Sequence, residues 1–284
     1  MKKQGKICFT VVLISLLTLS AVAQAEVYVE GFLGGNAAAN MGGASFHQRE
    51  VPPPPPPPQE ATPPETTLGS FINMGSSGHV TPAVAIGGRV GYWFVRTGAL
   101  GLQYPDWMKY FGVYTDVSFN QLKVSSQSVQ ASDHDDTGNF VGNFPGAFYS
   151  NGYVITWAFM VAGRYGFLPN DKVPFGRLQP WVGIGPAILF TGMRPKATVF
   201  NPDGSLAAIA NPGWRHTAIP ALVMDAGVRY MIRPNISVDL SFRYRYAQPN
   251  YQFNFTDMNG GPSRLHFNPV YNLFSGLLGV AYHF

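Results

Sequence analysis

Alternation of apolar and polar residues with a period of two recurs along the chain, and this is the pattern of a β-strand with two different faces. In 235–247, for example, the apolar series from Ile236 to Tyr246 alternates with a polar series from Ser237 to Arg245. Three of the segments are weaker because glycine and proline interrupt them, and Pro186 lies in mid-strand, where it removes a ladder donor. We predict eight strands, at 26–35, 83–95, 108–122, 152–167, 178–191, 218–232, 235–247 and 271–284.

The segments between these strands alternate between long and short. The long ones are 36–82, 123–151, 192–217 and 248–270, and the short ones are 96–107, 168–177 and 233–234. Outer-membrane barrels have short periplasmic turns and long surface loops. The chain is therefore predicted to be all-β, an eight-stranded antiparallel transmembrane β-barrel with four long surface loops and both termini in the periplasm.

The N-terminus has the three parts of a secretory signal peptide. Lys2, Lys3 and Lys6 precede an apolar run over 7–19, and Ala23-Gln24-Ala25 is a small-residue cleavage site. We predict a cleaved signal peptide at 1–25 and a single barrel domain at 26–284. A retained membrane anchor is the alternative, but the apolar run is short for a spanning helix.

Composition agrees with a barrel and excludes other classes. Charged residues make up only 12% of the chain and aromatic residues 14%, as expected where every second strand residue faces lipid. Removing Lys2, Lys3 and Lys6 from the 19 basic residues leaves 16 against 15 acidic ones, a net charge near +1. No basic stripe suggests nucleic acid. The single cysteine, Cys8, lies in the signal peptide, so a mature chain would have no disulfide or thiol chemistry.

Charged residues gather on the strand faces that are expected to point into the barrel. An eight-stranded barrel is only wide enough for side chains to fill it, and buried charges need partners. We predict a network of ion pairs and hydrogen bonds that plugs the lumen; a polar path for small solutes is the alternative. Its predicted members are Glu30, Arg89, Asp116, Arg164, Asp225, Arg229, Asp239, Arg243 and Arg245.

The last strand is apolar and aromatic on one face up to the final residue. Leu278, Val280, Tyr282 and Phe284 share that face, whereas the ends of soluble domains usually fray. Aromatic residues also cluster at other strand ends, as in the two interfacial girdles of a membrane barrel.

The first long connection contains an unbroken proline run from Pro52 to Pro58, followed by Pro63 and Pro64. Such a stretch is stiff and extended. We interpret 36–82 as a proline-rich extracellular loop whose proline run is a spacer; a ligand for a proline-binding groove is the alternative.

No enzymatic or metal-binding pattern emerges. The histidines fall in loops except His283, and none belongs to a recognisable Ser-His-acid pattern. The segment from Asp133 to Asp136 lacks the spaced ligands and glycine of an EF-hand loop, and is interpreted as a solvated acidic loop that bridges to lipopolysaccharide through cations. No catalytic residue, metal or cofactor is predicted.

The chain resembles the small outer-membrane β-barrel proteins of Gram-negative bacteria, the OmpA/OmpX-like superfamily. The resemblance rests on the signal ending in Ala23-Gln24-Ala25, on strand patterning over 26–284 and on the closing segment from Gly279 to Phe284. It implies that Leu278, Val280, Tyr282 and Phe284 form the signal read by the barrel-assembly machinery. It also implies an outer-membrane location and surface loops used in adhesion, defence or envelope integrity. The proline-rich first loop departs from this family.

The predicted function is therefore a structural and surface-interaction role, in contact with outer-membrane lipids and lipopolysaccharide and with a host or surface ligand through the loops. The alternative is a narrow channel for ions or small hydrophobic solutes. A lipid A-modifying enzyme is a third hypothesis, which needs a nucleophile and a base at the outer interface.

Overall fold

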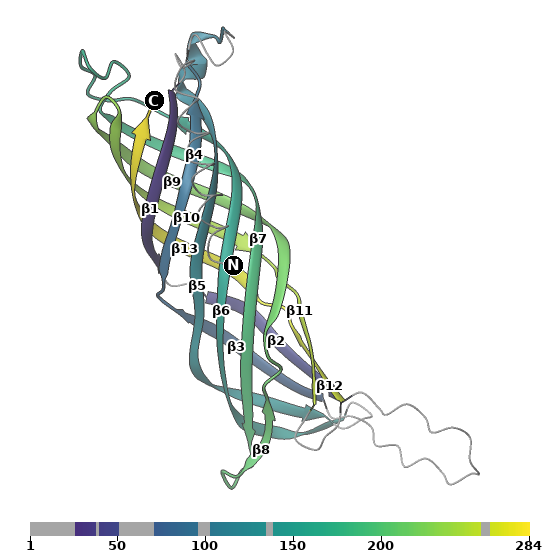
Figure 1. Cartoon of the computed structure of the whole chain (residues 1–284). Coiled ribbons are helices and arrows are strands. Elements are labelled where there is room, and N and C mark those ends of the chain that lie inside the picture. Colours follow the sequence, from purple (N-terminus) through teal and green to yellow (C-terminus); the bar gives the residue numbers. More distant parts are fainter. Residues whose placement is uncertain (1–25, 38–39, 51–70, 96–102, 135–138, 257–261) are drawn as a thin grey trace, which may run out of the picture.

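The computed structural model describes residues 26–37, 40–50, 71–95, 103–134, 139–256 and 262–284 (Figure 1). The predicted signal peptide, the proline run at 52–58 and residues 135–136 of the acidic segment lie outside these ranges. In the described part of the chain, no helix combines the length and the apolar character needed to cross a membrane.

Eight strands form a closed antiparallel ring, which confirms the predicted barrel. Each strand pairs with the next in the series, and the first pairs with the last. In ring order they are β1 (Glu26–Ala37), β4 (Val84–Trp93), β5 (Phe111–His134), β6 (Phe140–Arg164), β7 (Leu178–Phe200), β9 (Arg215–Arg233), β10 (Ile236–Ala247) and β13 (Val270–His283).

The ring closes between β1 and β13, in a register that runs from Tyr28 opposite His283 to Ala37 opposite Phe274. The two ends of the described chain therefore lie at the same end of the barrel, which we call the terminal end. The backbones approach so closely here that a Cβ on Gly34 would overlap the carbonyl oxygen of Gly276. In an outer-membrane barrel the terminal end faces the periplasm.

The outer surface of the ring is apolar over a band bounded by aromatic residues. Along β6 and the residue that follows it, the outward side chains run from Tyr153 through Trp157 and Phe159 to Tyr165. Twelve residues of strand span about 40 Å along the strand, or about 30 Å along the axis at the usual tilt. The band therefore matches the hydrocarbon core of a bilayer.

Beyond this band the barrel continues as a tall extension, which we call the hairpin end (Figure 1). The segments predicted as long connections contain the outer parts of β5, β6 and β7 and five further strands. β11, β12, β2 and β3 are hydrogen-bonded in that order and join β5, and β8 pairs with β7. These strands are β2 (Asn40–Glu50), β3 (Phe71–Thr81), β8 (Leu206–Ala210), β11 (Tyr251–Thr256) and β12 (Pro262–Phe267).

The extension was not predicted because the apolar residues change face where the wall leaves the membrane. On β5, apolar side chains point outward up to Phe119, whereas Leu122 and Val124 point inward and are buried. Lipid favours an apolar outer face, and water favours an apolar inner one. For this reason the continuous strand β5 was predicted to end at residue 122.

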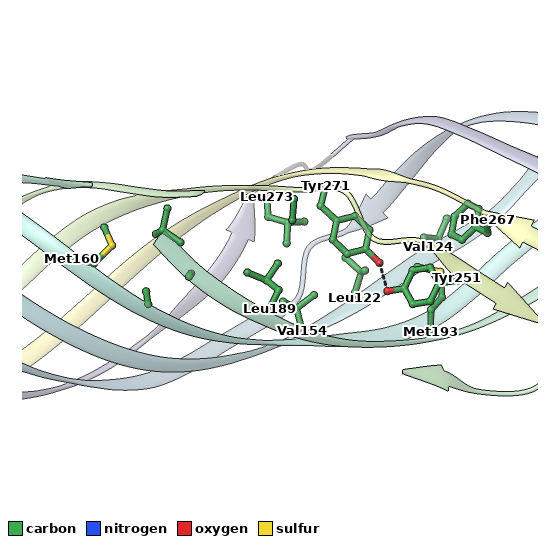
Figure 2. Packing of buried hydrophobic residues seen from close by; sticks show 14 of the residues in the cluster. Leu122, Val124, Val154, Met160, Leu189, Met193, Tyr251, Phe267, Tyr271 and Leu273 are labelled. Carbon is green, nitrogen blue, oxygen red and sulfur yellow. Dashed lines mark hydrogen bonds between the residues drawn. The ribbon is translucent and has the colours of Figure 1, made fainter. Parts of the chain in front are cut away.

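The interior of the extension is a packed apolar core (Figure 2). Leu122, Val154, Leu189 and Leu273 are fully buried. Further out, the hydroxyls of Tyr251 and Tyr271 lie 2.9 Å apart.

Two local features accommodate proline and the first short connection. The β6–β7 ladder lacks two residue pairs between Ala158–Ala187 and Val161–Ile184, with the register unchanged, and Pro186 lies in this gap. The predicted third strand begins later than expected because Asp106–Tyr110 forms a 3-10 helix, η3, before β5.

Candidate functional site

All nine residues of the predicted charge network lie inside the ring and are buried. Seven of them form a continuous cluster of ion pairs in the membrane-spanning half of the barrel. Arg245 is bonded to a separate set of neutral side chains, and Arg164 lies apart at the terminal end. The inward parity of each strand places them there, because alternate residues of a barrel strand face the lumen.

Arg243 of β10 is the centre of the cluster. Its Nη1 donates to Asp116 Oδ1 at 2.9 Å, and its Nη2 also donates to Asp116. Its Nε and Nη2 donate to the two oxygens of Asp225 at 2.9 and 2.8 Å. One guanidinium thus holds two carboxylates in the planar geometry that arginine favours.

Arg89 and Arg229 share the carboxylate of Glu30. Arg89 Nη1 lies 3.5 Å from Glu30 Oε2, and Arg229 Nη2 lies 2.7 Å from the same atom. Arg89 Nη2 also reaches Asp225 at 3.1 Å, and Arg229 Nε reaches Asp239 at 3.2 Å. Glu30 and Asp225 therefore connect the three arginines into one network.

Aromatic side chains complete the same layer. The Tyr114 hydroxyl donates to Asp225 at 2.8 Å, and the indole nitrogen of Trp181 donates to Asp239 at 2.8 Å. The guanidinium carbon of Arg89 lies 4.4 Å from the Tyr114 ring centroid and 4.9 Å from that of Trp181. These contacts exclude water and stabilise the buried cation.

Arg245 lies on the hairpin-end side of the cluster, next to the apolar core, since it pairs on β13 with the core residue Leu273. Among the residues that the structure describes it forms no ion pair. Instead it donates to four neutral side chains: Asn120 at 2.6 Å, Thr156 at 3.2 Å, Asn36 at 3.1 Å and Ser275 at 2.6 Å.

Arg164 pairs with Glu26 and donates to Gln179 at 3.2 Å. Glu26 and Asn36 were not predicted, although both have the inward parity of Glu30. Trp181 was also missed, because an aromatic residue was expected on the lipid side. Glu26 lies within the predicted strand 26–35, so its parity alone would have found it, and extending that strand by one residue would have added Asn36.

The ion-pair cluster and the layer around Arg245 together involve every strand of the ring. The cluster draws on Glu30 from β1, Arg89 from β4, Asp116 from β5, Trp181 from β7, Asp225 from β9 and Arg243 from β10. The Arg245 layer adds Thr156 from β6 and Ser275 from β13. Buried charges in such a layer are costly unless they are paired. The arrangement therefore suits a filled, rigid lumen at this level.

A serine, a histidine and a carboxylate do meet at the terminal end, contrary to the sequence analysis. The Ser237 hydroxyl lies 2.8 Å from His283 Nε2, and His283 Nδ1 lies 3.3 Å from Glu26 Oε1. The order of groups is that of a hydrolase triad. However, Ser237 is fully buried and Glu26 is held by Arg164. A nucleophile must reach its substrate, so this geometry does not by itself make a catalytic site.

Within the described ranges, no group of three or more His, Cys, Asp or Glu side chains is arranged to hold a metal ion. This finding does not extend to the whole acidic segment at 133–136, because its last two residues lie outside those ranges.

The predicted assembly residues lie on the outer face of the barrel. Leu278, Val280 and Tyr282 are exposed on β13, and Phe284 follows directly, with its backbone N–H bonded to Val27 O at 2.9 Å. The Tyr282 and Phe284 rings lie 5.0 Å apart.

Among solved structures, the chain is similar to several outer-membrane proteins. OprG from Pseudomonas aeruginosa is 10% identical, with a TM-score of 0.35 over 90% of this chain and 95% of that chain. Neisserial surface protein A is 14% identical, with a TM-score of 0.29 over 90% and 95%. The outer membrane protease OmpT from Escherichia coli is 10% identical, with a TM-score of 0.32 over 93% and 99%. No protein-family model and no curated protein sequence matches the chain.

The fold is that of an outer-membrane β-barrel. The closed ring and its apolar band establish this. At these identities the similarity concerns the fold alone, and a protease is among the similar proteins. Individual function has to be argued from the chain's own residues.

Proposed function

We propose that this protein is a sealed outer-membrane barrel with a structural and surface-interaction role and no enzymatic activity. The observation that carries the proposal is the filled lumen, in which the ion-pair cluster and the adjacent layer around Arg245 together take buried side chains from all eight strands. An eight-stranded barrel filled in this way has no room for a continuous aqueous path.

The extension supplies the surface for interaction. Strands β2, β3, β11 and β12 build a wall beyond the membrane band, so ligand-binding segments at its rim would be carried on a rigid base. Binding residues are commonly held on loops above such scaffolds. The proposed partner is a host or surface ligand, and cleavage of residues 1–25 during export is part of the proposal.

Conductance tests the seal. Purified protein in planar bilayers is expected to show no steady ion current, because the network fills the cross-section. The double variant Arg89→Ala/Arg243→Ala, which empties the middle of the lumen, serves as the open comparison. Frequent stable openings of the unmodified protein would contradict the proposal.

The surface role needs its own measurement. Cells that display the protein are expected to bind the proposed surface or host ligand, whereas a variant lacking 51–70 and 257–261 is expected to lose binding but retain heat-modifiable migration on a gel. Equal binding by a correctly folded variant would contradict a role for these segments.

A second candidate function is favoured by a gap in strand pairing. Residues Arg215 to Ala221 of β9 pair with β7 only, since β10 ends at Ala247 and β11 pairs with β12. An apolar hollow of about 600 Å³, lined in part by Pro186, Pro220 and Leu222, lies at this edge. Ile219 and Ala221 beside it pack against the apolar core of the extension.

This arrangement suits sideways passage of a small hydrophobic solute between the extension and the membrane, above the charge network. Ala221→Trp would fill the gap and is expected to slow uptake of a hydrophobic fluorescent solute by protein-containing liposomes. Ala226→Trp, on the outer face where β9 is paired on both sides, is the matched control. Equal uptake by liposomes with and without the protein would eliminate the candidate.

A further inference from the structure

Three exposed polar residues form one row across the outer wall of β5, β6 and β7. Lys123 lies opposite Asn151, and Asn151 lies opposite Arg194. All three are exposed. Because neighbouring strands are about 4.8 Å apart, the two cations are about 10 Å apart at the backbone.

One further cation lies next to this row. Lys196 is two residues beyond Arg194 on the same face of β7, with its Nζ 5.8 Å from the Tyr149 ring. We call Lys123, Arg194 and Lys196 the cationic patch.

The patch lies directly beyond the aromatic edge of the apolar band. The neighbouring row on the terminal side places Tyr153 and His216 on the same outer face, with the Tyr153 hydroxyl 3.0 Å from His216 Nδ1. Trp214 stacks on His216 with ring centroids 6.0 Å apart. The following row, still nearer the terminal end, holds the apolar Ile155 and Phe190. Tyrosine and tryptophan mark the headgroup level of a membrane, so the cations lie at that level or just beyond it toward the hairpin end.

Acidic side chains do not balance the patch. The segments 121–130, 143–153 and 190–200 contain no Asp or Glu. In the described part of the chain, none of these three cations takes part in an ion pair. Asp203, on the turn between β7 and β8, is fully exposed and accepts a hydrogen bond from Ser205, which lowers the pKa of its carboxyl.

We infer that the cationic patch binds the phosphate groups of lipid A in the outer leaflet. The charges are complementary, and the height is that of a lipid headgroup whose acyl chains would lie along Ile155 and Phe190. Arginine and lysine bind phosphate directly, arginine in a bidentate manner. The inference rests on the outer-membrane location and is independent of whether the lumen is sealed.

This contact is direct and differs from bridging by divalent cations, which needs carboxylates on the protein side. Binding to the patch should therefore persist in EDTA. It should weaken as salt concentration rises, because exposed charges are screened.

The test uses the full mature protein in detergent micelles, titrated with bisphosphorylated lipid A, with Trp fluorescence as the readout because Trp214 adjoins the patch. Arg194→Gln/Lys196→Gln is expected to weaken binding about tenfold. The matched control is Lys109→Gln/Lys172→Gln at the terminal end, where Lys109 also lies over a tyrosine ring, 5.2 Å from Tyr110. The control is expected to bind as the unmodified protein does.

Two further arms separate the sources of binding. Lipid A stripped of its phosphates should bind the unmodified protein about tenfold more weakly; equal affinity would show that only hydrocarbon is recognised and would overturn the inference. Inorganic phosphate at the same concentration should leave the fluorescence unchanged, because it lacks the acyl chains. Loss of lipid A binding in EDTA, or an equal loss in the control variant, would also overturn it.

Discussion

Asp116 and Arg243 are 127 positions apart in the sequence, yet Arg243 Nη1 donates to Asp116 Oδ1 at 2.9 Å in the middle of the lumen. Their strands, β5 and β10, are four places apart in the ring of eight and so lie on opposite sides of it. The pair therefore spans the barrel, and Asp225 joins it from β9.

Replacing Arg243 with methionine should destabilise the protein by about 3–5 kcal/mol, because it leaves Asp116 and Asp225 buried side by side without their cation. The free energy of unfolding, measured by urea titration in lipid vesicles, checks this. Asp203→Asn, at an exposed turn, is the control and should change stability by less than about 0.5 kcal/mol. An equally small effect of Arg243→Met would show that the network does not stabilise the barrel.

The position of the membrane can be tested on one strand. Ile184 of β7 is exposed on the outer face near the middle of the apolar band. Ile184→Arg should cost about 2–4 kcal/mol in lipid vesicles. Ser128→Arg, on the outer face of β5 in the extension, should cost almost nothing because that surface meets water. Similar costs at both sites would place the bilayer elsewhere.

The sequence was sufficient to predict the ring and the inward position of the charges. In all eight membrane-spanning strands the same rule applies: apolar residues face the lipid and the alternate residues face the lumen. Residues such as Arg89 and Asp239 could be assigned to the lumen from parity alone. Their pairing could not be predicted, since Glu30 meets Arg229 across 199 positions through the closure of the ring.

The extension could not be predicted by the same rule. Leu122 and Val124 have the inward parity of Asp116, but they are apolar where the membrane rule expects polar residues. The Ser237–His283–Glu26 contact was missed for another reason: it joins the ends of three strands and depends on the register of β1, β10 and β13.

The closing seam should depend on one glycine. A side chain on Gly34 would collide with the backbone of β13, whereas a Cβ on Gly31 of the same strand would meet nothing within 4 Å. Gly34→Ala should therefore lower the free energy of unfolding by about 1–3 kcal/mol and reduce the yield of heat-modifiable refolded protein. Gly31→Ala should refold normally. Normal stability and normal refolding of both variants would show that β1 and β13 can move apart at this position without loss of stability.

Ser237 should be unreactive in the folded barrel despite its histidine neighbour. A fluorophosphonate probe needs to approach the hydroxyl, and that oxygen belongs to a fully buried side chain. Mass spectrometry after treatment of the folded protein should therefore find Ser237 unlabelled. Labelling that disappears in His283→Ala, with the fold retained, would instead assign a nucleophile and contradict the non-enzymatic proposal.

Phe284 should matter for assembly in cells and not for stability of the finished barrel. Phe284→Ser keeps the backbone bond to Val27 and removes a ring that is 37% exposed, so the free energy of unfolding in vesicles should change by less than about 1 kcal/mol. The amount assembled in the outer membrane of cells should fall severalfold if the assembly machinery reads this residue. Tyr230→Ser is the control, since Tyr230 is an exposed aromatic residue near the terminal end of β9 that lies outside the C-terminal segment. Equal loss of assembled protein in both variants would assign the effect to the aromatic girdle in general, because girdle residues contribute to insertion wherever they lie.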